Sequence, residues 1–421
     1  IPSNHDFNIY NRSALPGINM TQIILGLQGL VLTLTYIGLG LGYIPGLRMN
    51  RATIALVGSA LLIAIGTLTL EQAWDAIDPH TIVFLLSMMV INAYLSYSGF
   101  FNLALVYLLR FIHSPLGLLV LLTFGTGILS AFFLNDTLAL VSTPLTLKLA
   151  RSLKLNPVPY LLAIAASTNI GSLATLSGNP QNILVGSFSG ISYLQFAQTL
   201  TPVAIVGLGL QIGLLCLLYP EVRISHPLPS NSLTQSPLYL HRPLLIKTII
   251  VTTLLLTAFI INLPLAESAF LAAAILLITR RIKPQRVLQQ VDWSLLVMFS
   301  GLFILTYCVQ SLQLLNHLST WVSYPLGLLV ITALLSNIIS NVPTVLLLQS
   351  FIPPDATSSW ILLAASATLA GNLTLFGSVA NLITVEAAAS GGDRLSFWEH
   401  LRFGFPLTVI TLTITYIWVI F

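Results

Sequence analysis

The chain has 421 residues, of which 56% are hydrophobic and 7% are charged, and its mean hydropathy is +0.93. A soluble globular chain carries about 25% charged residues, so this composition excludes a protein with a water-facing surface and indicates a polytopic membrane protein. The formal net charge of +4 is attributed to membrane topology rather than to nucleic-acid binding. The two cysteines, Cys216 and Cys308, both lie in apolar runs and predict neither disulfides nor a metal cluster.

Taken in chain order, residues 1–20 are polar and are expected to form an N-terminal tail. Apolar segments long enough to cross a bilayer lie near 21–43, 52–70, 81–97, 199–219, 243–262, 265–280, 293–308 and 403–421. Two more, near 158–187 and 360–390, are long enough but are interrupted in the middle. The segments near 115–150 and 325–352 carry the polar breaks "NDT" and "SNVPT" and predict re-entrant hairpins.

These segments predict an all-α polytopic fold of ten spans and two hairpins. If the N-terminus is outside, every Lys and Arg except Arg12 falls on the cytoplasmic side, as the positive-inside rule requires. We therefore expect both termini to be extracytoplasmic, in a bacterial inner or plasma membrane.

The sequence repeats itself. "PLGLLV" occurs at 115–120 and 325–330, and "TLSGNPQNIL" at 175–184 aligns with "TLFGSVANLI" at 374–383. The alignment predicts a first repeat over 21–219, a cytoplasmic linker over 220–242 and a second repeat over 243–421. Each repeat has five spans, a hairpin and one broken helix, and five crossings are an odd number, so the second repeat must be inverted.

Each broken helix carries Gly and polar residues at the same place, in "GNPQN" (178–182) and "GSVAN" (377–381). Lipid does not tolerate irregular backbone, because an unsatisfied peptide group costs several kcal/mol. One break alone would be explained by a kink in a buried helix. Two aligned breaks that face two hairpins instead indicate a secondary transporter with its site near the bilayer midplane.

The segments "FLNDTLALVSTPL" (133–145), "STNIGSLATLSGNPQNILVGSFSGISY" (167–193), "SNVPTVLL" (340–347), "AGNLTLFGSVANLI" (370–383) and "FWEHLRFGFP" (397–406) carry a family resemblance. The chain resembles the ion transporter superfamily of arsenite permeases, citrate-type carriers and sodium/proton antiporters. Within it, the chain is most similar to bacterial anion-permease-like proteins and plant silicic acid efflux transporters. The resemblance implies that each hairpin tip meets the unwound middle of its own half's broken helix, where cation and substrate bind.

Carried onto this sequence, the resemblance implies ion-coupling residues at Asn135, Asp136, Thr137, Gly171, Ser172, Ser340 and Asn341. Substrate-binding residues are expected at Asn179, Gln181, Asn182, Thr344, Asn372, Thr374, Ser378 and Asn381. Related carriers for dicarboxylates show Ser-Asn-Thr at both tips. This chain has Asn-Asp-Thr at the first tip and Ser-Asn-Val-Pro-Thr at the second, which speaks against two matching sodium sites.

Asp136 is the one acidic residue that the sequence places near mid-membrane. A charge there costs roughly 2.5–3.5 kcal/mol on insertion scales, so a functional role is favoured. It would carry a proton or, with Asn135, hold a transported sodium ion. The structural alternative is an N-cap for a helix beginning near Leu138.

The broken helices contain no Lys or Arg, since none occurs between Lys154 and Arg223 or between Arg286 and Arg394. The site is therefore expected to suit a neutral oxyacid, silicic acid or arsenite, which amides and hydroxyls can bind. Sodium-coupled uptake of a dicarboxylate or sulfate and sodium/proton antiport remain as alternatives.

An intramembrane enzyme is not expected, because no nucleophile–base pair or paired carboxylates occur at depth. The expected partners are the oxyacid, the lipid bilayer and a second copy in a homodimer, with no nucleic acid, no metal centre and no cofactor beyond the transported ion.

Overall fold

The computed structural model describes residues 20–109, 112, 114–223 and 240–421. Nearly all of the expected N-terminal tail and residues 224–239 of the expected linker lie outside the described residues. Over the described ranges all regular secondary structure is helical, as the composition predicted.

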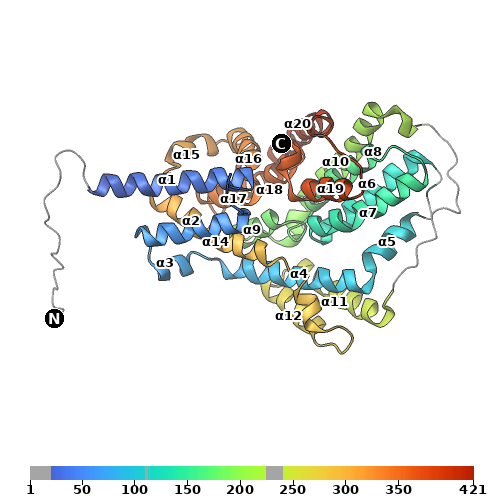
Figure 1. Cartoon of the computed structure of the whole chain (residues 1–421), viewed down its shortest axis with the longest axis horizontal. Coiled ribbons are helices and arrows are strands. Elements are labelled where there is room, and N and C mark those ends of the chain that lie inside the picture. Colours follow the sequence, from blue (N-terminus) through green and yellow to red (C-terminus); the bar gives the residue numbers. More distant parts are fainter. Residues whose placement is uncertain (1–19, 110–111, 113, 224–239) are drawn as a thin grey trace.

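The first half of the chain runs from α1 to the short 3-10 helix η1 (Figure 1). Its elements are α1 (Met20–Leu41), α2 (Arg51–Ala64), α3 (Leu70–Asp75), α4 (Pro79–Ser98), α5 (Phe100–Leu109), α6 (Pro115–Phe132), α7 (Asn135–Ser152), α8 (Val158–Ser172), α9 (Pro180–Ser189), α10 (Tyr193–Leu218) and η1 (Pro220–Arg223).

The second half repeats the order of the main elements. They are α11 (Arg242–Ile260), α12 (Leu265–Leu277), α13 (Pro284–Leu288), α14 (Trp293–Ser311), α15 (Asn316–Val322), α16 (Pro325–Ile339), α17 (Asn341–Leu348), η3 (Gln349–Phe351), α18 (Thr357–Ala370), η4 (Leu375–Gly377), α19 (Val379–Ser390) and α20 (Phe397–Ile420). In this order α4 corresponds to α14, the pair α6–α7 to α16–α17, and the pair α8–α9 to α18–α19.

Helix ends follow local chemistry. Asp78 caps α4 ahead of Pro79, and Gly99 ends the helix at φ 83°. Because this backbone conformation suits glycine, the chain can turn there into α5, a short apolar helix that the sequence analysis did not predict. Ser114 likewise caps α6 ahead of Pro115.

Seven described helices are long and apolar enough to cross a bilayer, namely α1, α4, α6, α10, α11, α14 and α20. Two of the expected spans form helices that are shorter than a bilayer crossing requires. The segments near 52–70 and 265–280 form α2 and α12, helices of 14 and 13 residues, whereas a crossing needs about 20. Both occupy the second place in their halves, so the shortening is a shared feature of the fold.

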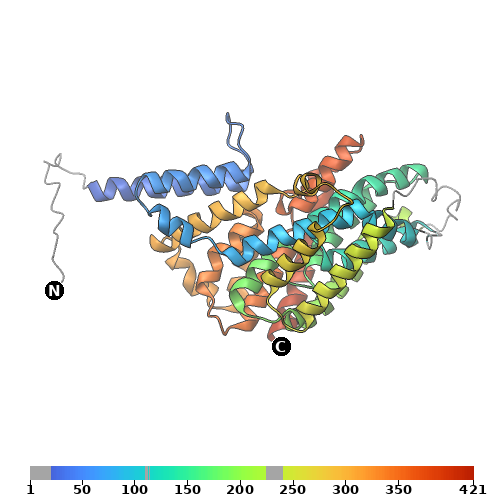
Figure 2. The same ribbon diagram turned by 90° about the horizontal axis from the view of Figure 1, so that it is seen from below.

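The halves interleave instead of forming two lobes (Figure 2). The short helix of each half packs on the long helix of the other, α2 on α14 and α12 on α4. Between α2 and α14, Ser59 Oγ donates to the carbonyl oxygen of Gly301 at 3.0 Å. Figure 1 shows α9, α17, α18 and α19 near the middle of the molecule.

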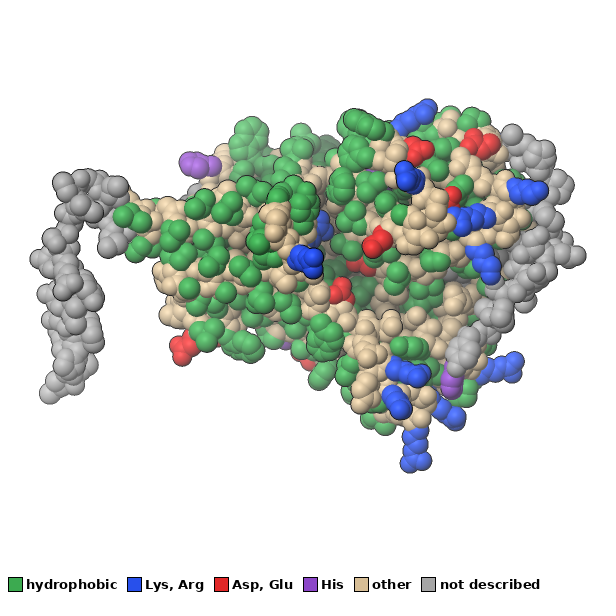
Figure 3. Space-filling view, viewed as in Figure 1, with side chains coloured by type: hydrophobic (Ala, Val, Ile, Leu, Met, Phe, Trp, Pro, Cys, Tyr) green, Lys and Arg blue, Asp and Glu red, His purple; other side chains and the backbone are tan. Residues whose placement is uncertain are grey.

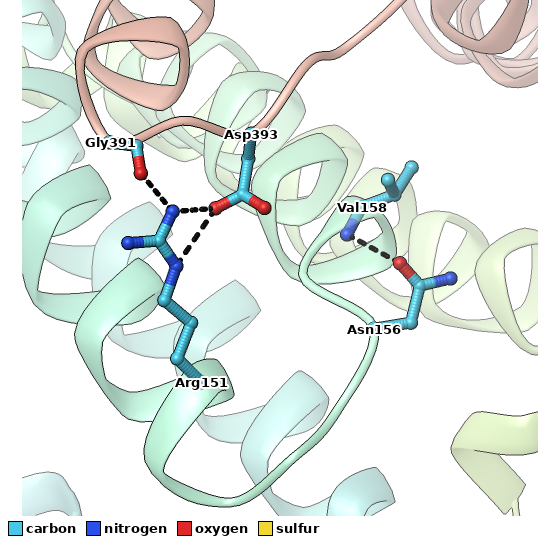
Figure 4. A network of polar contacts seen from close by, with 5 residues as sticks. All are labelled: Arg151, Asn156, Val158, Gly391 and Asp393. Atoms are coloured by element: carbon cyan, nitrogen blue, oxygen red, sulfur yellow. Dashed lines mark hydrogen bonds and ion pairs between the residues drawn. The ribbon is translucent and has the colours of Figure 1, made fainter.

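A polar contact at the end of α7 also joins the halves (Figure 4). Arg151 Nε donates to Asp393 at 3.1 Å, and the guanidinium also contacts the carbonyl oxygen of Gly391. Nearby, Asn156 accepts the N–H of Val158 at 3.1 Å and so orders the turn into α8. The Arg151 side chain is 48% exposed, and partly exposed ion pairs contribute little, so this pair is a minor support.

Candidate functional site

The first break, residues 173–179, separates α8 from α9. A helix that stops inside a protein leaves its last carbonyl groups without intrahelical partners. Asn182, just after the break, provides hydrogen-bond donors for such carbonyl groups. Its Nδ2 donates to the carbonyl oxygens of Ser172 at 3.0 Å and Thr175 at 2.9 Å. The segment "GNPQN" therefore provides hydrogen-bond partners for the backbone of its own break. Gly178 is also required, because a Cβ there would collide with the backbone of Ser172.

The second break, residues 371–378, separates α18 from α19 in the same way. Asn381 Nδ2 donates to the carbonyl oxygens of Gly371 at 2.8 Å and Thr374 at 3.1 Å. In the alignment of "TLSGNPQNIL" with "TLFGSVANLI", Asn381 matches Asn182. An asparagine thus donates to backbone carbonyl oxygens of the break in both halves.

Each helix after a break begins with a side-chain cap. Asn179 accepts the N–H of Asn182 at 2.8 Å, and Pro180 opens α9. Ser378 accepts the N–H of Ala380 at 3.2 Å and opens α19. These caps turn the N-terminal ends of two half-helices, which carry partial positive charge, towards the interior.

The breaks are joined across the halves by Asn169, a buried residue of α8. Its Nδ2 donates to Oδ1 of Asn372 at 2.9 Å and of Asn381 at 3.2 Å. Its Oδ1 accepts from Ser378 Oγ at 2.8 Å. A first-half side chain therefore binds directly into the second break.

Thr368, a buried residue of α18, makes the reverse connection. Its Oγ1 accepts from Asn179 Nδ2 and Gln181 Nε2, both at 3.2 Å, and lies 3.3 Å from Asn182 Oδ1. The register that aligns the two breaks also pairs Asn169 with Thr368. The two breaks therefore form one polar network, because Asn169 of the first half bonds to the second break and Thr368 of the second half bonds to the first. We call these two the exchanged contacts.

The first hairpin tip, Phe133–Thr137, reaches this network. The backbone N–H of Asn135 donates to the carbonyl oxygen of Gly178 at 3.2 Å, and its Nδ2 donates to Asn169 Oδ1 at 3.2 Å. Asn135 Oδ1 is buried with no hydrogen-bond partner. The helix begins at Asn135 rather than near Leu138, and no side chain caps it, so capping does not account for Asp136.

The second tip, Ser340–Thr344, meets the second break. With its amide turned towards its acceptors, Asn341 donates to the carbonyl oxygens of Gly377 at 3.3 Å and Ala367 at 3.1 Å. Ser340 has φ 82° and ψ 159°, a conformation that is costly for residues with a Cβ. Thr344 Oγ1 donates to the carbonyl oxygen of Ser340 at 2.9 Å, within its own helix.

A cavity of about 1250 Å³ opens where both tips, the start of α9 and the second break meet. Six of the sequence-predicted residues line it: Asn135, Asp136, Gln181, Ser340, Asn341 and Ser378. Residues of α1, α2 and α14 complete the wall. Figure 3 shows a hollow near the centre of this face with acidic side chains at its edge.

Three charged side chains line the cavity: Arg51, Asp136 and Asp292. Arg51 Nε donates to the carbonyl oxygen of Leu39 at 3.1 Å, near the C-terminal end of α1. That end carries partial negative charge, which the guanidinium offsets. The balance of the lining is therefore acidic.

The other predicted residues lie around the cavity rather than in its lining. Asn179, Asn182, Asn372 and Asn381 belong to the network described above. Ser172 Oγ accepts from Asn179 Nδ2 at 2.9 Å, and Thr374 Oγ1 donates to Asn337 Oδ1 at 3.0 Å. Gly171 lies against the backbone of Gly127 in α6, where a side chain would not fit. Thr137 is partly buried in the first turn of α7.

Sequence reasoning did not assign Asn169, Thr368, Asn337 or Asp292 to the site. Asn169 and Thr368 carried one available signal, because both are polar residues in apolar helices at matching places in the repeat. Nothing in the sequence indicated which break each would contact.

Comparison with known proteins supports a transporter. Residues 39–358 match the sequence model of the family described as citrate transporter (CitMHS). A 46 kDa membrane protein of Mycobacterium leprae is 31% identical, with 88% of this chain and 94% of that protein covered. The silicon efflux transporter LSI3 of Oryza sativa subsp. japonica is 30% identical over 88% of this chain and 92% of its own length.

The fold is also similar to that of a solved structure. The YdaH transporter of Alcanivorax borkumensis, whose topology is described as unusual, matches with a TM-score of 0.58 and covers 95% of this chain and 97% of its own. Sequence identity is 13%, so this likeness concerns the fold alone.

Proposed function

The chain belongs to the citrate transporter (CitMHS) family, and on that premise we propose that this integral membrane transporter exports a small neutral oxyacid, of the silicic acid or arsenite type, in exchange for a proton or sodium ion. Asp136 is the proposed coupling residue, with Asn135 as its neighbour if the ion is sodium. Gln181 and Ser378 are the proposed substrate contacts.

One observation carries the proposal. The cavity joins both tips, the start of α9 and the second break, and apart from Arg51, Asp136 and Asp292 its polar lining side chains are amides and hydroxyls. Such groups bind a hydroxylated neutral acid through hydrogen bonds alone, whereas a dianion would need positive charge to offset the acidic lining. The relative in Oryza sativa is named for silicon efflux, which agrees with this substrate class.

A second candidate is sodium-coupled uptake of an anion such as a dicarboxylate or sulfate. Arg51 in the cavity wall and the family's description as citrate transporters favour it. Against it, Arg51 is already bonded near the end of α1, and no other basic side chain of the described residues lines the cavity. Sodium/proton antiport through Asp136 is a third candidate, which would need no oxyacid.

The proposed setting is a bacterial inner or plasma membrane, with both termini outside and the linker inside. The asymmetric distribution of Lys and Arg along the sequence is its basis. Association into a homodimer is part of the same proposal and can be checked by light scattering with detergent correction.

Reconstituted vesicles test the function directly. Silicic acid, arsenite and succinate would each be supplied under a proton gradient and, separately, under a sodium gradient. We expect the oxyacids to move against the driving cation and to compete with each other. Sodium-dependent succinate transport that excess arsenite or silicic acid leaves unchanged would defeat the proposal in favour of anion uptake.

A further inference from the structure

Two aspartates hold matching places in the two halves. Asp78 precedes α4, where its Oδ2 accepts the N–H of Thr81 at 2.8 Å. Asp292 precedes α14, where its Oδ1 accepts the N–H of Leu295 at 3.0 Å. Asn, Ser or Thr would cap these helices comparably, so capping alone does not require a charge at either place.

Each aspartate lines a different cavity. The exposed Asp292 belongs to the 1250 Å³ cavity that reaches Asp136, the start of α9 and the second break. Asp78 belongs to a second cavity of about 300 Å³, together with Asp75, Gln310 and Gln349. The smaller cavity is bounded by Phe188 of α9 and Phe303 of α14, whose ring centroids lie 6.4 Å apart.

Negative charges are in excess among the side chains that line the two cavities. In the larger cavity Asp136 and Asp292 face Arg51, which is bonded to the Leu39 carbonyl oxygen. In the smaller one, the charged lining residues are Asp75 and Asp78. Both cavities therefore attract cations and repel anions.

A separate observation points to a cation in the larger cavity. Asn135, only 5% exposed, lines that cavity and has an Oδ1 atom without a hydrogen-bond partner. A buried carbonyl oxygen beside a carboxylate is the kind of ligand that hard cations prefer. Asp292 thus lines the same cavity as a group that still lacks a partner.

We propose that Asp292 is a cation-receiving carboxylate of the larger cavity that concentrates the coupling cation before it reaches Asp136. This rests on the proposed cation-coupled function. Because the effect is electrostatic, added inert salt weakens it.

The test uses the full chain in vesicles of one orientation, with the driving cation titrated separately on each face. Asp292→Asn keeps the cap and removes the charge. It should raise the half-saturating cation concentration on one face by about threefold to tenfold and leave the maximal rate unchanged. Asp355→Asn, an exposed loop residue outside both cavities, is the matched control and should change neither titration.

The outcomes separate the two ideas. Cation-driven wild-type transport with an unchanged titration in Asp292→Asn overturns the inference and leaves the function standing. Equal shifts on both faces for Asp292→Asn also overturn it, because the carboxylate would then not act through one cavity. A wild type that shows no dependence on either cation overturns the proposed function and the inference together.

Discussion

Asp136 lies on the first hairpin tip, next to a network made of amides and hydroxyls. Asn135, which precedes Asp136 in the chain and belongs to that network, forms hydrogen bonds with both Gly178 and Asn169. Asp136 itself is partly buried, lines the cavity and neither caps a helix nor forms an ion pair among the described residues. A carboxylate kept in such a place without a structural task is most simply explained by transport.

Replacing Asp136 with Asn is therefore expected to reduce gradient-driven transport to background while the protein stays folded. Asn has nearly the same shape, so packing at the tip survives and only the titratable charge is lost. Transport in vesicles measures the first effect, and thermal unfolding in detergent measures the second. Full gradient-driven transport by the variant would show that coupling does not need this carboxylate.

Asn182 and Asn381 are expected to support the fold more than they select the substrate. Each donates to one carbonyl oxygen where a half-helix ends and to a second one inside the break. Changing either to Ala leaves these buried acceptors without a donor and should lower the unfolding free energy by about 1–3 kcal/mol. The exposed Asn102→Ala, on α5, should stay within about 0.5 kcal/mol of wild type. Equal stabilities for all three variants would contradict the assigned role.

Ser340 carries backbone strain at the second tip, with φ 82°. Ser340→Gly should raise the unfolding free energy by about 1 kcal/mol, because glycine adopts this conformation without a Cβ clash. Ser340→Ala removes the same hydroxyl but keeps the clash, so it should not stabilise. A comparison of denaturation midpoints separates the two effects, and a gain in both variants would assign it to the hydroxyl instead.

At the scale of elements, polar breaks in apolar runs were a reliable guide. They placed the helix–turn–helix pairs α6–α7 and α16–α17 and the divisions between α8 and α9 and between α18 and α19. The end of α2 was not predictable, because apolar residues continue past Ala64, whereas α12 ends at Leu277, within three residues of the expected limit. The contacts of Asn169 and Thr368 depend on which helices meet, and periodicity within a single helix carries no such information.

The element α9 also closes the smaller cavity. Phe188 packs on Phe303, and Thr81 Oγ1 donates to Ser187 Oγ at 3.1 Å. We expect Phe188→Ala to widen this cavity and to speed modification of a cysteine placed at Gln310 by a membrane-impermeant thiol reagent, in a variant lacking Cys216 and Cys308. Phe188→Leu, which retains bulk, is the control. An unchanged rate in Phe188→Ala would show that another contact restricts the cavity.

At the scale of the molecule, the two halves do not act as separable domains. Helices of one half pack on helices of the other, and each break is bonded by a residue from the opposite half. The ion pair between Arg151 and Asp393 adds a contact at the periphery (Figure 4). A structural change at one break is therefore expected to alter the structure at the other. This is suited to a site that residues of both halves form together.

This coupling can be measured by a double-mutant cycle across the halves. Asn169→Ala and Ser378→Ala each remove one partner of the 2.8 Å hydrogen bond, and residues in direct contact typically show interaction energies of about 0.5–3 kcal/mol. Thr368→Ala with Asn179→Ala should give a similar value, because these residues hold the matching places in the repeat. Asn169→Ala with the distant Asn102→Ala should be additive within about 0.5 kcal/mol. Unfolding in mixed micelles gives the free energies. If both cross-half cycles were additive, the exchanged contacts would not couple the two breaks, and each half would build its part of the site alone.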